Sequence, residues 1–104
     1  MITKNTSYFK RLETLFGQLS FGEAMTAFRT TLGLNQREFA NILDLSNQNL
    51  CDIEKGRKIP SIQRASKIAK KLQIPEMALI ELSLRDSLKA AGLNYRLRLE
   101  SEGK

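Results

Sequence analysis

The chain has 104 residues, with 17 Lys plus Arg against 11 Asp plus Glu, so its formal net charge is +6. This length allows one compact domain, and the 41% of hydrophobic residues supply a single core. The absence of histidine removes the usual general base and the commonest metal ligand, together with the histidine-dependent nucleophile pairs. We therefore expect no enzymatic activity, no metal and no cofactor.

The sequence also indicates a compartment. A single cysteine, Cys51, forms no internal disulfide and suits a reducing environment. Residues 1–9 lack the apolar core of a signal peptide, and no apolar run reaches the roughly 20 residues that cross a bilayer. We expect a cytoplasmic protein with no membrane partner. The basic surplus makes nucleic acid the first partner to consider, although a well-solvated surface gives the same charge.

The first third of the chain predicts two helices. Apolar residues recur at helical spacing within residues 1–20: Tyr8, Leu12, Leu15, Phe16 and Leu19. This stripe predicts an amphipathic N-terminal helix. Ser20 and Glu23 have the spacing of a capping box, which predicts the start of a second helix. Gly33 is expected to end that helix in the left-handed conformation.

The middle of the chain predicts three further helices, each with a polar cap. Asn35 and Ser46 are expected to cap two short helices, and Gly56 to end the second of them. Ser61 is expected to cap a longer helix whose outward side is basic. That side carries four cations with no acid in residues 61–75: Arg64, Lys67, Lys70 and Lys71. We favour a solvated face, and further contacts to DNA phosphates are the alternative.

The last helix is predicted from Pro75 to about Ala91, and it is apolar on more than one side. One apolar stripe consists of Met77, Ile80, Leu84 and Leu88. Leu79 and Leu82 point elsewhere. Because so small a monomer does not need a second apolar face, we expect Leu79 and Leu82 to lie on a dimer surface.

The tail changes its period, because apolar residues alternate there with polar ones: Leu93, Tyr95, Leu97 and Leu99. Alternation predicts a half-buried β-strand, and a strand needs a partner for its backbone groups. The partner is either the segment around Ile2 and Thr3 or a second chain. We expect one compact domain with an N-terminal helix (1–20), a helical core (21–75) and a C-terminal helix and strand (76–104).

Residues 34–56 resemble the helix-turn-helix of the phage-repressor and Cro-like (XRE) family, and the resemblance extends over residues 21–72, roughly half of the chain. Small or apolar residues stand where the motif packs its two helices: Ala40, Leu45, Leu50 and Ile53. The resemblance implies an all-α fold, a lambda-repressor-like domain of five helices. Here that domain carries the added N-terminal helix and the short C-terminal β-strand.

The second helix of the motif presents amides outward. Asn and Gln each carry a donor and an acceptor, which is the pairing geometry for the adenine edge in the major groove. We expect base reading by four residues of this helix: Asn47, Gln48, Asn49 and Asp52. A merely solvated polar face is the alternative, but the whole constellation matches the family in register.

The resemblance also implies phosphate contacts around the motif. In this family the residue matching Gln36 contacts DNA phosphate, as do the helix N-terminal amides, and Asn35 and Arg37 lie at the same helix end here. Four further phosphate contacts are expected after the turn and in the loop beyond the second helix: Ser46, Lys55, Arg57 and Lys58. Such contacts set affinity rather than sequence choice.

Two more matches concern structure. Arg29 and Glu54 match positions that form an ion pair in close relatives, and the resemblance implies that this pair holds the recognition helix against its neighbour. The turn position that is usually glycine is Asp44 here. Asp tolerates the left-handed conformation better than most residues, so we expect the turn to form with slight strain.

The function implied is a sequence-specific regulator that binds double-stranded DNA, a dimeric repressor of its own or a neighbouring operon. Two-fold dimers read palindromic operators whose half-sites lie about one helical turn apart. We expect the tail strands, with Leu79 and Leu82, to join the homodimer. The alternative is an antitoxin or a protein-interaction adaptor whose C-terminal strand pairs with a partner protein, such as a cognate toxin.

Overall fold

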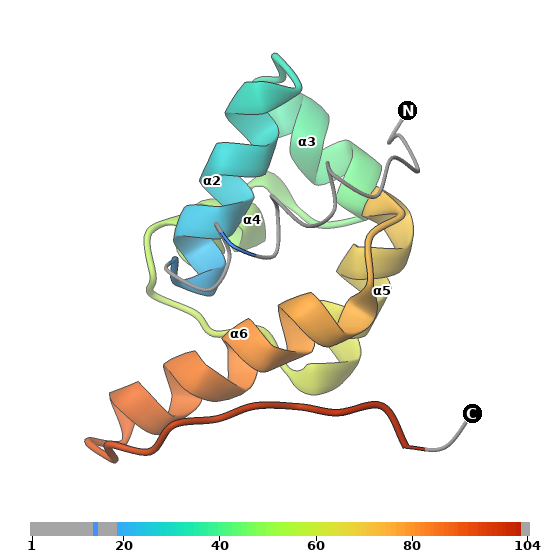
Figure 1. Cartoon of the computed structure of the whole chain (residues 1–104). Helices are drawn as coiled ribbons and strands as arrows, with labels where there is room; N and C mark the ends of the chain where they lie inside the picture. The colour runs from blue at the N-terminus through green and yellow to red at the C-terminus, as the bar shows by residue number, and fades with distance from the viewer. Residues whose placement is uncertain (1–13, 15–18, 103–104) are drawn as a thin grey trace.

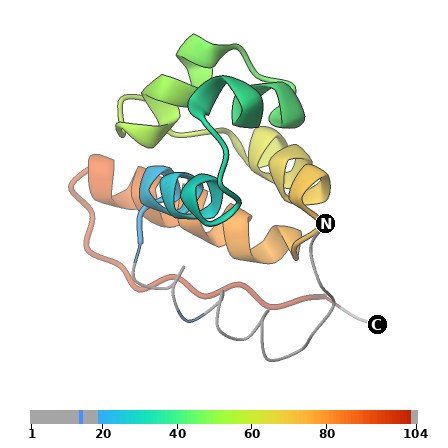
Figure 2. The same ribbon diagram turned by 90° about the horizontal axis from the view of Figure 1, so that it is seen from above.

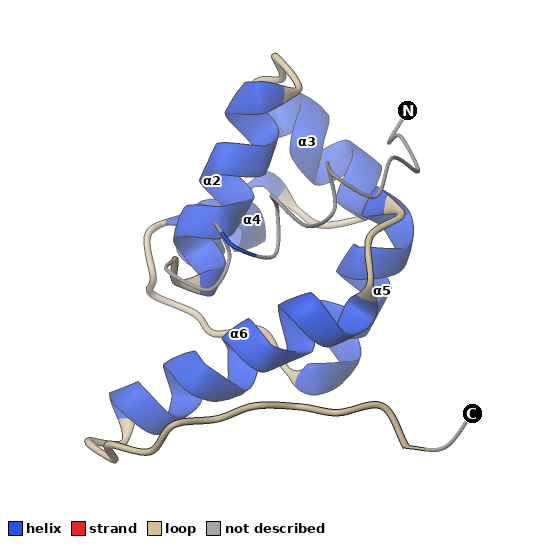
Figure 3. Ribbon diagram, in the orientation of Figure 1, coloured by secondary structure: helices blue, strands red, loops and turns tan. Residues whose placement is uncertain are grey.

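Five helices make up the described part of the chain, which in this computed structural model comprises Thr14 and residues 19–102. They are α2 (Phe21–Thr31), α3 (Gln36–Leu43), α4 (Asn47–Glu54), α5 (Ile62–Leu72) and α6 (Glu76–Ala90) (Figure 1). Within residues 19–102 there is no strand (Figure 3). The all-α fold with five helices is therefore confirmed. The N-terminal helix predicted over residues 1–20 falls outside the described residues, Thr14, Leu19 and Ser20 excepted.

Local capping explains where the helices begin. The first four described helices start at the predicted polar residues, each of which accepts a hydrogen bond from the backbone N–H three residues on: Ser20, Asn35, Ser46 and Ser61. The carboxylates of Glu23 and Glu38 in turn accept from the backbone N–H groups of Ser20 and Asn35, which completes two capping boxes. Pro75 was predicted to be the first residue of the last helix, but α6 begins one residue later, at Glu76. Pro75 is the N-cap and makes no side-chain cap bond.

Left-handed residues explain where several helices end. Gly33 has φ +73°, as its predicted terminating role requires. Asp44 has φ 63° and ends α3, so the prediction for the turn is confirmed. Gln73 ends α5 in the same conformation with φ 59°, which the sequence did not predict. A long side chain is unusual at such a position, since Cβ approaches the carbonyl oxygen.

One core joins all five helices. Its largest fully buried side chains come from every helix of the described fold: Phe21, Met25, Phe39, Leu50, Ile68, Leu79 and Leu82. Each such side chain contributes about 1.5–3 kcal/mol when removed from water. Helix α4 packs on α2 and α3, while α5 and α6 pack on each other (Figure 2). The core therefore buries the side of α4 that carries Leu50 and Ile53 and leaves its opposite side in solvent.

The structure corrects the prediction for α6. Leu79 is 0% exposed and Leu82 is 1% exposed, so both belong to the core and neither lies on a dimer surface. Met77, which belongs to the other apolar stripe, is 39% exposed. Periodicity showed two apolar sides on this helix, but it carried no information on which side meets α5 and α2. That choice depends on contacts between helices far apart in the sequence.

The predicted C-terminal strand is also not formed in the described chain. Residues 93–102 are extended without strand pairing and run back along α6 (Figures 1 and 2). Leu97 and Leu99 are half-buried, whereas Tyr95 is 69% exposed. The Leu99 N–H donates to a Glu81 carboxylate oxygen at 2.9 Å. A strand requires a second backbone beside it, and here the tail lies against the side chains of a helix.

Helix α6 is the longest of the described helices, with 15 residues. None of the helices in the described part of the chain is both long enough and apolar enough to cross a bilayer.

Candidate nucleic-acid interface

Helices α3 and α4 form a helix-turn-helix whose turn consists of residues 44–46. The Leu45 N–H donates to the Ala40 carbonyl at 2.9 Å, which closes the turn after left-handed Asp44. Ala40 is buried and Leu45 is half-buried, as expected for the crossing point and the turn anchor. Ser46 then caps α4. The turn thus sets the direction in which α4 leaves α3.

The backbones of α2 and α4 approach each other at Gly22. A Cβ placed on Gly22 would lie 2.2 Å from the Ile53 carbonyl oxygen, far inside van der Waals contact. Gly22 is therefore required for the position of α4. The sequence pattern did not single it out. A glycine inside the first turn of a helix is a residue that helices disfavour, and this feature was the available signal.

An ion pair fixes the C-terminal end of α4. The Arg29 Nε lies 2.8 Å from Glu54 Oε2, and Arg29 Nη2 lies 3.2 Å from Glu54 Oε1. The Glu54 side chain is only 5% exposed and that of Arg29 is 19% exposed, so water screens this pair little. Arg29 Nη1 also donates to the Leu34 carbonyl at 3.2 Å. The pair implied by the resemblance is present, with bidentate geometry.

Gln36 extends this network. Its Nε2 donates to Glu54 Oε1 at 3.0 Å, so the side chain lies half-buried between α3 and α4. We refer to Gly22, Arg29, Gln36 and Glu54 as the α4 clamp. The phosphate contact of Gln36 stays a prediction, whereas the bond from its amide nitrogen to Glu54 was not predicted. The α4 clamp joins three helices through one carboxylate and one close backbone contact.

The solvent side of α4 carries the four residues predicted to read bases. Asn47 and Gln48 are exposed, whereas Asn49 and Asp52 are half-buried. Gln48 Nε2 donates to Asp52 Oδ1 at 3.0 Å. Side chains one turn apart on α4 are therefore already joined.

The loop after α4 folds back onto this side. Arg57 Nη1 lies 3.3 Å from Asp52 Oδ1, and Lys58 Nζ donates to Asn49 Oδ1 at 2.9 Å. The Arg57 side chain is 58% exposed, so its positive charge still faces solvent. Two of the predicted phosphate contacts thus lie beside the predicted base readers. Lys55 is exposed and forms no ion pair with any described residue.

The N-terminal end of α3 supplies the remaining predicted contacts. Arg37 is exposed and makes no ion pair within the described chain. Asn35 Oδ1 accepts from the Glu38 N–H at 2.8 Å, which commits that oxygen to the capping box. The Asn35 amide nitrogen is the group left for an outside ligand. The first turn of α3 also contributes the positive end of the helix dipole.

Nothing in the described residues gathers three or more His, Cys, Asp or Glu side chains into a group that could hold a metal ion. This surface instead carries amides, exposed cations and the Asp52 carboxylate, which is paired with Arg57. Such groups make hydrogen bonds to base edges and charge contacts to phosphates. The arrangement defines a helix-turn-helix of the DNA-binding class.

Comparison with known proteins agrees with this class. A family model described as helix-turn-helix matches residues 26–79, which is 54 of the 104 residues and includes all of α3, α4 and α5. The chain belongs to the XRE/Cro-like helix-turn-helix family of DNA-binding transcription regulators. Neither the curated proteins nor the solved structures contain a match.

Proposed function

We propose that this chain is a sequence-specific repressor that binds double-stranded DNA as a homodimer and regulates its own or a neighbouring operon. One observation carries the proposal. Helix α4 is held from behind by the α4 clamp while its amide-bearing side faces solvent beside the exposed cations of the following loop. A helix presented in this way fits the major groove, where amides pair with base edges.

In this proposal α4 enters the major groove with its N-terminal end leading. Asn47 and Gln48 reach base edges, and Gln48 is oriented by its bond to Asp52. Asn49 offers its amide nitrogen, because Lys58 occupies its oxygen. Asp52 acts chiefly by holding Arg57 in position to contact the phosphate backbone of the DNA.

Phosphate contacts come from both sides of α4 and determine affinity. One group lies at the start of α3: Asn35, Gln36 and Arg37. The other follows the turn and α4: Ser46, Lys55, Arg57 and Lys58. The Ser46 oxygen already accepts from the Asn49 N–H at 3.0 Å, so its hydroxyl hydrogen is the group that meets a phosphate.

Replacement of Gln48 tests the reading helix. Sequences are first selected from random duplex DNA by the full chain, and a palindromic consensus is expected. Gln48→Ala should lower affinity for that consensus about tenfold or more while leaving affinity for unrelated DNA nearly unchanged, because one amide–base pair is lost. Asn41→Ala, which removes an exposed amide of α3 that takes no part in the proposed contacts, is the matched control and should change neither affinity. If alanine at Asn47, Gln48 and Asp52 together leaves the footprint unchanged, base reading by α4 is wrong.

Dimerisation is proposed to use the tail. Leu93 is 45% exposed and Tyr95 is 69% exposed, and the extended backbone beside them has no strand partner among the described residues. Antiparallel pairing of two tails would bury these side chains together with Leu97 and Leu99. Truncation after Gly92 should then give a monomer by light scattering that binds the operator weakly. A truncated chain that is still dimeric contradicts this part of the proposal.

The same exposed tail favours one second function, an antitoxin or protein-interaction adaptor. A cognate toxin or other partner protein would then supply the strand that pairs with residues 93–99. This alternative predicts that the full chain alone is monomeric in solution. It also predicts that Tyr95→Ala weakens binding of the partner without changing the affinity of the monomer for DNA.

A further inference from the structure

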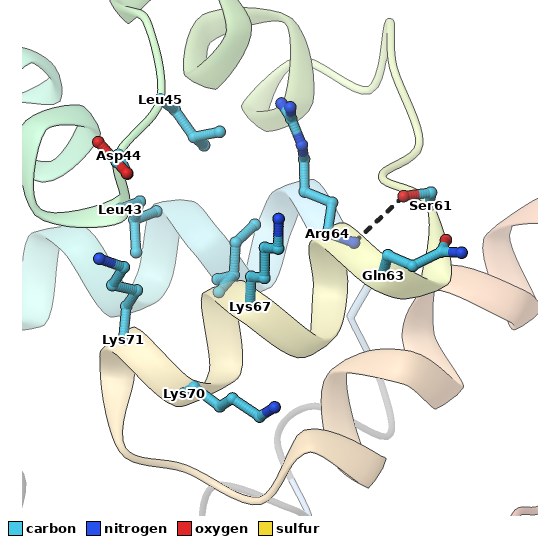
Figure 4. Close-up of a pocket in the computed structure, with 10 residues that line it drawn as sticks. Leu43, Asp44, Leu45, Ser61, Gln63, Arg64, Lys67, Lys70 and Lys71 are labelled. Atoms are coloured by element: carbon cyan, nitrogen blue, oxygen red, sulfur yellow. Dashed lines mark hydrogen bonds between the residues drawn. The ribbon is translucent and has the colours of Figure 1, made fainter.

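A groove lies between the turn of the helix-turn-helix and the outward side of α5. Its volume is about 420 Å³. Three apolar side chains contribute to its wall: Leu43, Leu45 and Ile68. Figure 4 shows Lys67 and Lys71 extending from α5 toward the side where Asp44 and Leu45 lie. The sequence alone favoured solvent over phosphate contacts for this side of α5, and it indicated no surface facing it.

The groove is strongly basic. Four cationic side chains of α5 line it: Arg64, Lys67, Lys70 and Lys71. Asp44 is the one acidic residue among its described lining residues, and no ion pair joins it to any of the four cations. Cations that lack carboxylate partners and share one concave surface produce a positive potential there. The occupant that fits is therefore an anion with several charges.

The groove is continuous with the reading side of α4. A neighbouring hollow of about 410 Å³ shares Ser61 and Arg64 with the groove. Asn49 and Lys58, which lie on the solvent side of α4 and in the loop after it, also line that hollow. Basic surface therefore extends from the loop after α4, past Arg64, to Lys67 and Lys71.

The groove also lies where α4 itself provides no cation. Residues 46–54 contain Asp52 and Glu54 and no base, and the loop cations follow the C-terminal end of α4. The groove adjoins residues 44–45, directly before the N-terminal end of the helix. A helix in the major groove is bordered by phosphate backbone, and the cations of α5 add positive charge beside this end of α4.

We propose that this groove binds the phosphodiester backbone of the duplex that α4 reads, with Lys67 and Lys71 each contacting a phosphate. The inference rests on the proposed function, because α4 must bring the duplex to this side of the molecule. A duplex carries one negative charge for about every 1.7 Å of its axis, which matches a row of cations better than a compact anion does. Deoxyribose carbons pack against the apolar wall. The continuity with α4 favours DNA over an acidic polypeptide.

Salt dependence of DNA binding by the full chain measures these contacts. The probe is a mixed-sequence duplex of about 30 base pairs, roughly three helical turns. Lys67→Gln combined with Lys71→Gln should reduce the slope of log affinity against log salt by about 1.8 for each bound protomer, since each phosphate contact contributes about 0.9. The control is Lys89→Gln, which removes an exposed charge at the end of α6, outside the groove and outside residues 93–99, and should leave the slope unchanged.

The outcomes separate this proposal from the proposed function. If the wild-type chain shows no salt-dependent binding to duplex DNA, both proposals fail. If the wild type binds and the Lys67 and Lys71 variant keeps its slope, the groove proposal alone is overturned. Lys67→Arg combined with Lys71→Arg keeps both charges and should keep the slope of the wild-type chain. Urea denaturation of the two double variants checks that neither substitution unfolds the protein.

Chemical acetylation of lysines supplies an independent readout. The duplex should protect Lys67 and Lys71 of the wild-type chain from acetylation, as measured by mass spectrometry, and leave Lys89 at the end of α6 reactive. Poly-glutamate is the comparison ligand. Protection of Lys67 and Lys71 by poly-glutamate but not by the duplex would overturn the proposal and assign the groove to an acidic protein.

Discussion

The α4 clamp and the C-terminal tail hold their parts of the molecule in different ways. The clamp combines a close backbone contact at Gly22 with a bidentate ion pair to a Glu54 side chain that is 5% exposed. The tail contacts α6 through two half-buried leucines and one hydrogen bond from Leu99 to Glu81. The helix proposed to read DNA is thus fixed within the protomer, whereas the tail keeps most of its polar backbone available for another chain.

This difference bears on function. A reading helix must keep its amides within hydrogen-bond distance of base edges, and small displacements remove those bonds. A segment that pairs with a second chain must instead exchange its weak internal contacts for a new ladder. Three substitutions test the comparison, beginning with the largest expected effect.

Replacement of Gly22 by alanine should have the largest effect. The new Cβ would lie 2.2 Å from the Ile53 carbonyl oxygen, and since that oxygen is backbone, α2 or α4 must shift. We expect a loss of about 3 kcal/mol in the free energy of unfolding, at the upper end of overpacking costs. Urea denaturation measures this loss, which should appear as a lower midpoint at an unchanged m value.

Gly33→Ala is the matched control. Gly33 has φ +73°, and a methyl group added to it would meet no atom of a non-neighbouring residue within 4 Å, so the substitution tests backbone strain without a steric clash. The expected cost is about 1 kcal/mol. Equal losses at Gly22 and Gly33 would mean that the close approach of α2 and α4 does not position the reading helix.

Loss of the ion pair should have the second largest effect. Arg29→Ala leaves the Glu54 carboxylate almost buried, with Gln36 as its remaining side-chain partner, and should cost about 2 kcal/mol. Arg57→Ala removes the other ion pair, in which the arginine is 58% exposed, and should change stability by less than about 0.5 kcal/mol. Urea midpoints of the two variants compare the pairs directly. Similar losses would contradict the burial argument.

The smallest effect is expected in the tail. Glu81→Ala removes the acceptor of the Leu99 N–H and should cost about 0.5 kcal/mol, because the bond is partly exposed. Amide hydrogen exchange of Leu99 should become faster, while that of Leu50 in the core stays unchanged. A loss as large as that of Arg29→Ala would show that the tail is an integral part of the fold and would weaken its assignment to dimerisation.

Much of the helix-turn-helix was predictable because its determinants are local. Ser46 and Asn35 cap helices through bonds to residues three positions away, and Asp44 turns the chain by its own backbone conformation. The ion pair of Arg29 with Glu54 joins distant residues, and the family resemblance rather than local chemistry implied it. Gly22 was missed, because its importance comes from a carbonyl 31 residues away in the chain.

The amino-acid order alone was enough for the helix starts, the left-handed turn, the amides on α4 and the cations on α5, since each depends on residue type and short spacing. Tertiary structure decided which apolar side of α6 is buried, because Leu79 and Leu82 belong to the core of a fold in which α2 and α5 pack on α6. It also decided that the cations of α5 face the turn across a groove. Burial and concavity belong to pairs of elements, and no single helix contains that information.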